Sequence, residues 1–138
     1  MIKNAPFRFS DFEYVDLQYG ERDSMFNSYN SSTQEYNFLN NENKVVETKL
    51  KLTNDDLLYI HRKAMEMGFW NVDNDMTTPR DNPEEGKRVP RFILEFKYKE
   101  KSKKVTIDTD YPGNPKMRDA AMTTVETVIQ TLNRAYAR

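Results

Sequence analysis

The chain has 138 residues and a formal net charge of −1, and it contains one histidine, His61, and no cysteine. This length predicts a single domain over residues 1–138. The composition excludes thiolate nucleophiles, disulfide bonds and multi-histidine metal sites. No cofactor is expected. The balanced charge gives no electrostatic field that would attract the protein to nucleic acid.

The chain has no apolar run long enough to span a bilayer. Residues 1–6 also lack the apolar segment of a signal peptide. Taken literally, these features predict a cytoplasmic protein. A periplasmic or extracellular location stays open, because a chain whose signal peptide had been removed would look the same.

The N-terminal part predicts one strand followed by a loop. Residues 7–19 alternate between apolar and polar side chains, with a break near Ser10 and Asp11 where the alternation changes phase. Gly20 ends the pattern. Residues 21–32 are polar and rich in Asn and Ser, which predicts a loop with at most a strand edge near Phe26.

Two further strands and a helix follow. Residues 34–39 and 44–52 alternate around an Asn-rich turn, which predicts a hairpin with one charged face. Thr53 is expected to cap a helix, with acidic residues in its first turn. The helix is expected to end at Gly68, where the chain can adopt a left-handed conformation.

Residues 71–88 form a long polar connection with a candidate disordered tip at 80–86. Residues 92–98 and 105–111 then alternate strongly enough to predict a second hairpin. Two registers remain open, one with Tyr98 opposite Val105 and one with Lys97 opposite Asp108. Both registers place all the apolar side chains on one face. Asn114 is expected to cap the terminal helix.

These elements predict an α+β fold of two layers. The sheet is expected to be antiparallel with four or five strands, in the order strand, strand, strand, helix, strand, strand, helix. Because the strands alternate in polarity, one face is expected to carry both helices and the other to stay open to solvent.

The segments 35–38, 53–70 and 92–132, together with a texture rich in Asn, Tyr and Thr, resemble small α+β domains of unknown function found in bacterial secreted proteins and lipoproteins. The resemblance implies an exported origin. It brings no catalytic residues with it.

Acidic residues supply the first candidate sites. Asp108 and Asp110 are expected on the open face, with Glu95 on the neighbouring strand. There they could act as the acid and base of a carboxylate-based hydrolase, or bind a cation. Pairing with Arg91, Lys97 or Lys99 is the structural alternative. Lys97 is itself a candidate binding residue of this face.

Asp73 and Asp75 alternate like the start of a calcium loop, and Glu84 falls at the twelfth position. Thr78 stands where that loop requires glycine, so an ordinary acidic loop is the better interpretation. No metal site is predicted.

Aromatic residues supply the second set of candidates. Trp70 and Phe69 follow the first helix and are expected either to pack on its end or to anchor a partner. His61 lies on the apolar face of that helix and is expected to border the core rather than to act as a base. Clustering of Trp70, Tyr14 and Tyr36 on the surface would favour partner binding.

The basic stretch 87–104 could contact nucleic acid, but lysines that keep a sheet edge soluble explain it equally well. The function expected from the sequence is therefore that of a non-catalytic interaction module. Its partner is expected to be a protein rather than nucleic acid, contacting either the open face or the loop at 71–88. That face could also form a homodimer.

Overall fold

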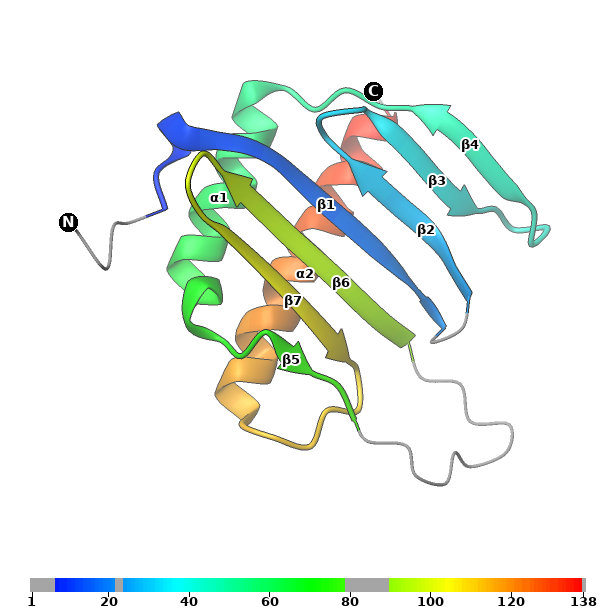
Figure 1. Cartoon of the computed structure of the whole chain (residues 1–138). Coiled ribbons are helices and arrows are strands. Elements are labelled where there is room, and N and C mark those ends of the chain that lie inside the picture. Colours follow the sequence, from blue (N-terminus) through cyan, green and yellow to red (C-terminus); the bar gives the residue numbers. More distant parts are fainter. Residues whose placement is uncertain (1–6, 22–23, 79–89, 138) are drawn as a thin grey trace.

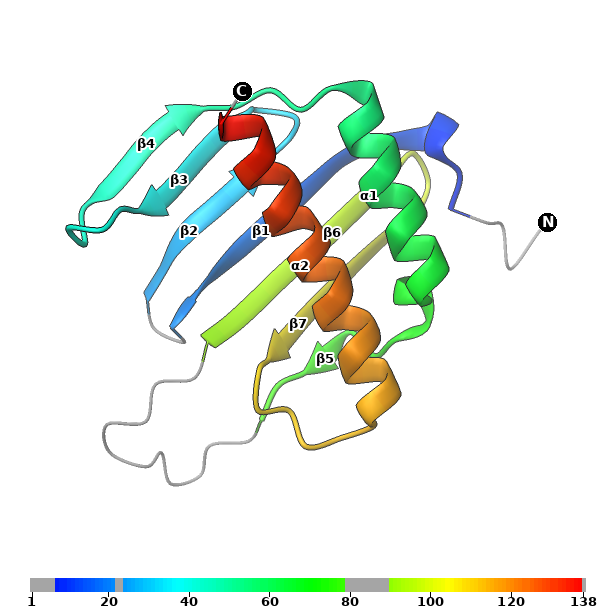
Figure 2. The same cartoon turned by 180° about the vertical axis from the view of Figure 1, so that it is seen from behind.

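The structure, a computed structural model, describes residues 7–21, 24–78 and 90–137. In these residues seven strands form one sheet in the order β4-β3-β2-β1-β6-β7-β5, and two long helices lie on one of its faces (Figures 1 and 2). The strands are β1 (Phe12–Glu21), β2 (Ser24–Asn30), β3 (Glu35–Leu39), β4 (Val45–Lys49), β5 (Asp75–Met76), β6 (Pro90–Tyr98) and β7 (Ser102–Asp108). The helices are α1 (Asn54–Met67) and α2 (Pro115–Ala137), with short 3-10 turns at Phe9–Asp11 and Phe69–Asn71.

The α+β class and the placement of both helices on one face are confirmed. The predicted strand number and element order are wrong, because the described residues contain two further strands, β2 and β5. The prediction of a wholly antiparallel sheet is also wrong, because β5 runs parallel to β7. The correct order is four strands, a helix, three strands and a helix.

The segment 21–32 is predicted as a loop because it is polar and rich in Asn and Ser, whereas the structure has strand β2 there, with Tyr29 buried. The sequence of β2 alternates only weakly, and the neighbouring strands provide the hydrogen-bond partners that stabilise it. The strand pairs with β1 on one side and β3 on the other, and the Tyr29 hydroxyl donates to the Leu50 carbonyl at 2.8 Å. Tertiary pairing therefore overrides a weak local pattern.

The core lies between the sheet and the helices. Leu17, Leu94 and Val105 are cross-strand neighbours on β1, β6 and β7, and each is about 1% exposed. Val125 and Val128 of α2 are fully buried with them in one cluster. The predicted apolar faces of these strands and of α2 are therefore confirmed.

The second hairpin has a register that neither expectation gave. Leu94 pairs with Val105 and Arg91 with Asp108. The Tyr98 N–H donates to the Lys101 carbonyl at 2.8 Å, which closes a two-residue turn. A turn placed two residues earlier keeps every side chain on its predicted face but changes its partner, since strand side chains repeat every two residues.

The helix ends follow the predictions. Thr53 and Asp56 form a reciprocal capping box at the start of α1, and Gly68 ends that helix with φ of 77°. Asn114 accepts hydrogen bonds from the first backbone N–H groups of α2, whose first residue is Pro115. No helix among the described residues is long and apolar enough to cross a membrane.

Candidate functional site

The open face is the sheet surface opposite the helices. Because cross-strand partners share a face, the ladder identifies its residues. On β1 they include Asp16 and Gln18, on β6 Glu95, and on β2 Ser28. All of the candidate acidic residues on the strands therefore lie on this face or at its end.

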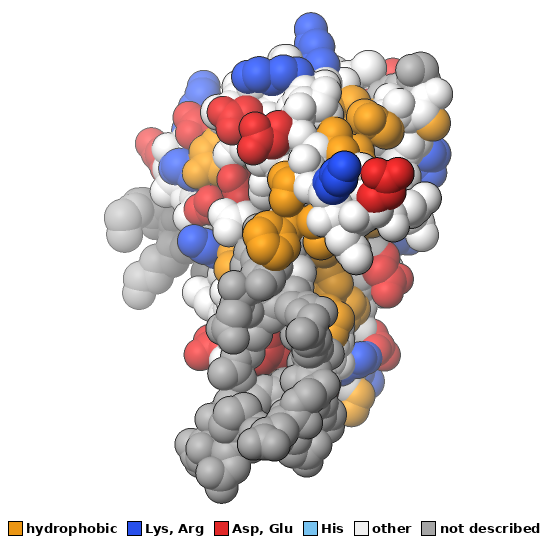
Figure 3. Space-filling view, turned by 90° about the vertical axis from the view of Figure 1, so that its right-hand side faces the viewer, with side chains coloured by type: hydrophobic (Ala, Val, Ile, Leu, Met, Phe, Trp, Pro, Cys, Tyr) orange, Lys and Arg blue, Asp and Glu red, His pale blue; other side chains and the backbone are white. Residues whose placement is uncertain are grey.

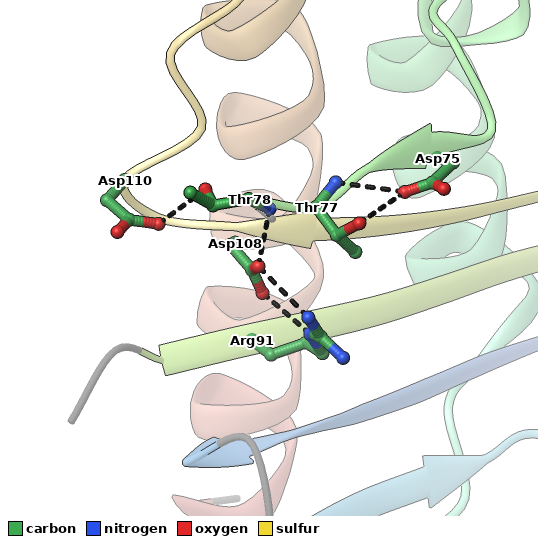
Figure 4. Close-up of polar contacts among 6 residues, drawn as sticks. All are labelled: Asp75, Thr77, Thr78, Arg91, Asp108 and Asp110. Atoms are coloured by element: carbon green, nitrogen blue, oxygen red, sulfur yellow. Dashed lines mark hydrogen bonds and ion pairs between the residues drawn. The ribbon is translucent and has the colours of Figure 1, made fainter. Parts of the chain in front are cut away.

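Asp108 sits at the end of β7 and is held from two sides (Figure 4). Arg91 donates to it through Nε at 2.6 Å and through a terminal guanidinium nitrogen at 3.0 Å. The Thr78 backbone N–H donates to the same carboxylate at 2.8 Å. The side chain of Asp108 is fully buried, whereas that of Arg91 stays about a quarter exposed.

These partners determine the protonation state of Asp108. Burial alone would raise its pKa, but the hydrogen bonds from Arg91 and Thr78 outweigh that effect and lower the pKa below its ordinary value. A buried carboxylate that is ionised and fully bonded serves as a structural anion. It does not have the raised pKa that a general acid requires.

The same cluster joins two chain segments. The Thr78 hydroxyl donates to Asp110 at 2.7 Å, and the Thr109 N–H donates to the Pro90 carbonyl at 3.1 Å. Thr78 and Pro90 are the described residues on either side of the gap at 79–89. Asp108 and Asp110 therefore hold the two ends of that segment together at the end of β7. The predicted disordered tip at 80–86 lies outside the described residues.

The three candidate carboxylates do not converge. Glu95 lies four residues along β6 from Arg91, which corresponds to roughly 13 Å from the Asp108 cluster. Glu95 accepts a hydrogen bond from the Tyr14 hydroxyl at 3.2 Å. Lys97, the other open-face candidate, donates to the Tyr98 carbonyl at 2.8 Å. The geometry thus separates the residues that a carboxylate hydrolase would need to bring together.

Asp75 closes a local turn, accepting from the Thr77 N–H at 3.0 Å and the Thr77 hydroxyl at 2.6 Å. These bonds lower the pKa of Asp75. Asp73 is exposed, and Glu84 lies outside the described residues. Among the described residues no group of three or more Asp, Glu or His side chains could hold a metal ion.

The aromatic candidates lie on the helix side of the sheet. Phe69 is fully buried, and Trp70 stacks on Phe7 with ring centroids 4.3 Å apart. His61 Nδ1 lies 2.6 Å from the Tyr98 hydroxyl. Burial lowers the His61 pKa and raises that of Tyr98, so the neutral forms of both groups are favoured in this hydrogen-bonded pair.

Trp70, Tyr14 and Tyr36, whose clustering on the surface would favour partner binding, do not cluster. Tyr36 is buried, Tyr14 lies on the open face, and Trp70 lies on the helix side. The number of aromatic residues in a sequence does not show which face of the sheet each ring occupies.

A different apolar surface is present, which sequence reasoning missed. Phe26, Leu39 and Val45 are 47%, 37% and 45% exposed. Leu39 pairs with Val45. Phe26 lies on the neighbouring strand β2, beyond the last pair of the β2–β3 ladder, and the Leu39 N–H donates to Asn27 Oδ1 at 3.3 Å, which brings this end of β2 beside Leu39. We call these three side chains the apolar row. The sequence would have predicted the apolar row only if β2 had been recognised as a strand that pairs with β3.

Two hollows are lined by residues of strands β1 to β4 and of the loop between β2 and β3. One of about 250 Å³ is lined by Asp16, Gln18, Ser28, Tyr29, Asn30, Thr33 and Glu35. The second, of about 400 Å³, is lined by Glu35, Asn37, Glu47, Thr48 and Lys49. Apart from Tyr29, every residue that lines the two hollows has a polar or charged side chain, whereas small-molecule sites are usually lined by apolar side chains.

The basic stretch does not form one surface. Lys103 lies on the helix side and donates to the Val72 carbonyl, while Lys101 lies over the Phe7 ring at 4.3 Å. Lys97 and Lys104 point to the open face. Residues 87 and 88 lie outside the described residues. Among the described lysines the alternation of the strand therefore splits the positive charge between two faces.

The comparisons with known proteins found no relative of this chain. No protein-family model matches the chain, and no curated protein and no solved structure shows a significant match to it.

Proposed function

We propose that the protein is a non-catalytic interaction module that binds a protein partner through the open face of its sheet. One observation carries the proposal. Both helices cover the same face, and on the opposite face of β3 and β4 lie Leu39 and Val45 of the apolar row, with the exposed Phe26 on the next strand. A contiguous exposed apolar patch on a protein surface marks a contact site for other proteins, and exposed apolar side chains on three successive strands can supply such a patch.

The surroundings of the row support a protein partner over a small molecule. Glu47, Lys49 and Asn37 lie beside the row on β3 and β4, and they line a polar hollow. An apolar centre with a charged border is the usual composition of a protein–protein contact. Figure 3 looks onto the side of the molecule where β4 lies and shows hydrophobic side chains there among charged ones.

The acidic residues do not favour an alternative. Asp108 is bonded to Arg91 and Thr78, and Glu95 is bonded to Tyr14, so each has a structural partner. A hydrolytic function through these residues would require a concave site that the separation of Glu95 and Asp108 does not provide.

The test uses affinity capture from the cells that make the protein, with the full chain as bait. Leu39→Glu places a charge in the centre of the apolar row and should abolish capture of the partner. Met65→Glu is the matched control, because Met65 is exposed apolar surface on α1 at 51%. The proposal predicts a protein retained by wild type and by M65E and lost with L39E.

Equal retention by L39E and wild type would contradict the proposal, as would the absence of any protein that distinguishes L39E from M65E. Far-UV circular dichroism and urea unfolding of both variants show whether loss of capture reflects the surface or the fold.

A further inference from the structure

We propose that strand β4 pairs with β4 of a second copy of the chain, so that the two sheets join edge to edge in an antiparallel dimer. The inference concerns the edge of the sheet rather than its open face. It goes beyond the proposed function, and either can fail while the other holds.

The backbone of β4 has one side available for pairing. β4 is the terminal strand of the sheet order and pairs with β3 alone among the described strands (Figure 1). The Leu50 N–H donates to Gln34, and the Lys44 carbonyl accepts from Asn40. Even-numbered residues therefore point their backbone groups toward β3, and Val45, Glu47 and Lys49 point theirs outward.

One antiparallel register makes this edge complementary to itself. If Thr48 lies on the two-fold axis, Glu47 of each copy lies opposite Lys49 of the other on the open face. Both residues are exposed and belong to the outward-pointing set, so they would also exchange backbone hydrogen bonds. The Lys49 ammonium donates to the Thr33 carbonyl at 3.1 Å and retains two further N–H donors for the second copy.

The same register matches side chains on the helix side. Val46 of one copy lies opposite Leu50 of the other, and the two Thr48 side chains face each other. Val46, Thr48 and Leu50 are all half-buried, so the new pairing would cover apolar surface that the helices leave partly exposed. Apolar pairs and Thr–Thr pairs across strands are both stabilising.

The neighbouring registers lack this match. Centring the pair on Glu47 puts the two Glu47 carboxylates opposite each other, and centring it on Val46 puts Val45 opposite Glu47. Both place a carboxylate beside a like charge or an apolar side chain. The Thr48 register is therefore the one that the sequence of β4 favours among the three.

The dimer would keep both open faces on the same side, because cross-strand partners share a face. Two copies would then present one continuous open face with both apolar rows. The strands are short, so the association is expected to be weak and concentration-dependent.

Sedimentation velocity over a range of concentrations tests the proposal. Wild type should shift from the monomer mass of 16.4 kDa toward twice that value as concentration rises. E47K and K49E each place like charges opposite one another and should raise the dissociation constant at least tenfold. The double variant E47K/K49E, or an equimolar mixture of the two single variants, should recover dimers. K104E, at an exposed open-face lysine away from β4, should behave as wild type.

Glu47→Pro gives an independent test of the backbone. Proline removes an N–H that points away from β3, so the hairpin can persist while the edge loses a donor. The variant should also weaken dimers at least tenfold, and urea unfolding checks that the chain still folds. A wild type that stays monomeric at ~1 mM would overturn the proposal. Charge variants that dimerise as wild type does, with no recovery effect in the mixture, would overturn it as well.

Discussion

The two halves of the sheet differ in what covers them. Strands β1, β6 and β7 lie under both helices and contribute fully buried side chains such as Val15, Phe96 and Ile107. Strands β3 and β4 lie at the other end of the sheet, where the end of α2 contributes Tyr136 against Tyr36 and Phe38. Among the described strand residues, the exposed large hydrophobic side chains are Phe26, Leu39 and Val45, which lie on β2, β3 and β4.

The difference separates residues that stabilise the fold from residues that a partner protein could contact. In the covered half, Asp108 is bonded to Arg91 and Thr78, so its charge stabilises the fold. In the half formed by β2, β3 and β4, Phe26 and Leu39 are exposed. The residues with the most distinctive chemistry are therefore structural, and the residues available to a partner are ordinary apolar ones.

The largest expected effect comes from changing the same residue type in each half. Phe96→Ala should destabilise the fold by roughly 3–5 kcal/mol, because it leaves a cavity in the core. Phe26→Ala should change the free energy of unfolding by less than about 0.5 kcal/mol, because Phe26 is half-exposed. Urea unfolding measures both. Similar costs for the two variants would end the distinction between the halves.

The next largest effect is expected at the buried ion pair. Asp108→Ala leaves the Arg91 guanidinium without its carboxylate, and because Arg91 is 24% exposed, water offsets part of the loss. We expect destabilisation of about 3 kcal/mol. Asp119→Ala, which removes an exposed carboxylate 3.7 Å from Arg118, is the control and should cost almost nothing. A small effect at Asp108 would remove the argument that its charge is structural.

A smaller effect is expected at the start of α1. Thr53→Ala removes the side chain that accepts the Asp56 N–H at 3.1 Å and should cost about 1 kcal/mol. Thr53→Ser keeps the hydroxyl and should stay near wild type. If both variants unfold alike, the capping box contributes nothing to the stability of the helical layer.

The smallest and most specific effect concerns pH. Burial lowers the pKa of His61 in the folded protein below its ordinary value of 6.5. Between these two values the unfolded chain binds more protons, so the free energy of unfolding should fall as the pH drops below about 6.5. Because the chain has one histidine, its ring signals in NMR titrate without overlap. A folded pKa at or above 6.5 would contradict the buried pairing with Tyr98.

The sequence predicted well wherever the pattern was local and strong. The Thr53 cap, the Gly68 end and the apolar face carrying Phe96 all depend on residues within one element, and each is confirmed. The hairpin register was missed because a turn at residues 99–100 and a turn two residues later give the same alternation.

The candidate site was harder to predict, because it depends on which strands are neighbours. The sequence placed Asp108 near Arg91 as one of several options, but not the Thr78 N–H that completes the cluster. The apolar row needed β2 to be recognised as a strand, and that strand owes its place to pairing with β1 and β3.

Site-specific photo-cross-linking in the cells that make the protein tests the central claim most directly. A benzophenone amino acid replaces Asn37, which lies on the open face beside the apolar row, or Met65, which is exposed on α1. The account predicts a discrete cross-linked protein from position 37 and none from position 65. Cross-links to the same protein from position 65 alone would place the contact surface on the helices and contradict the account.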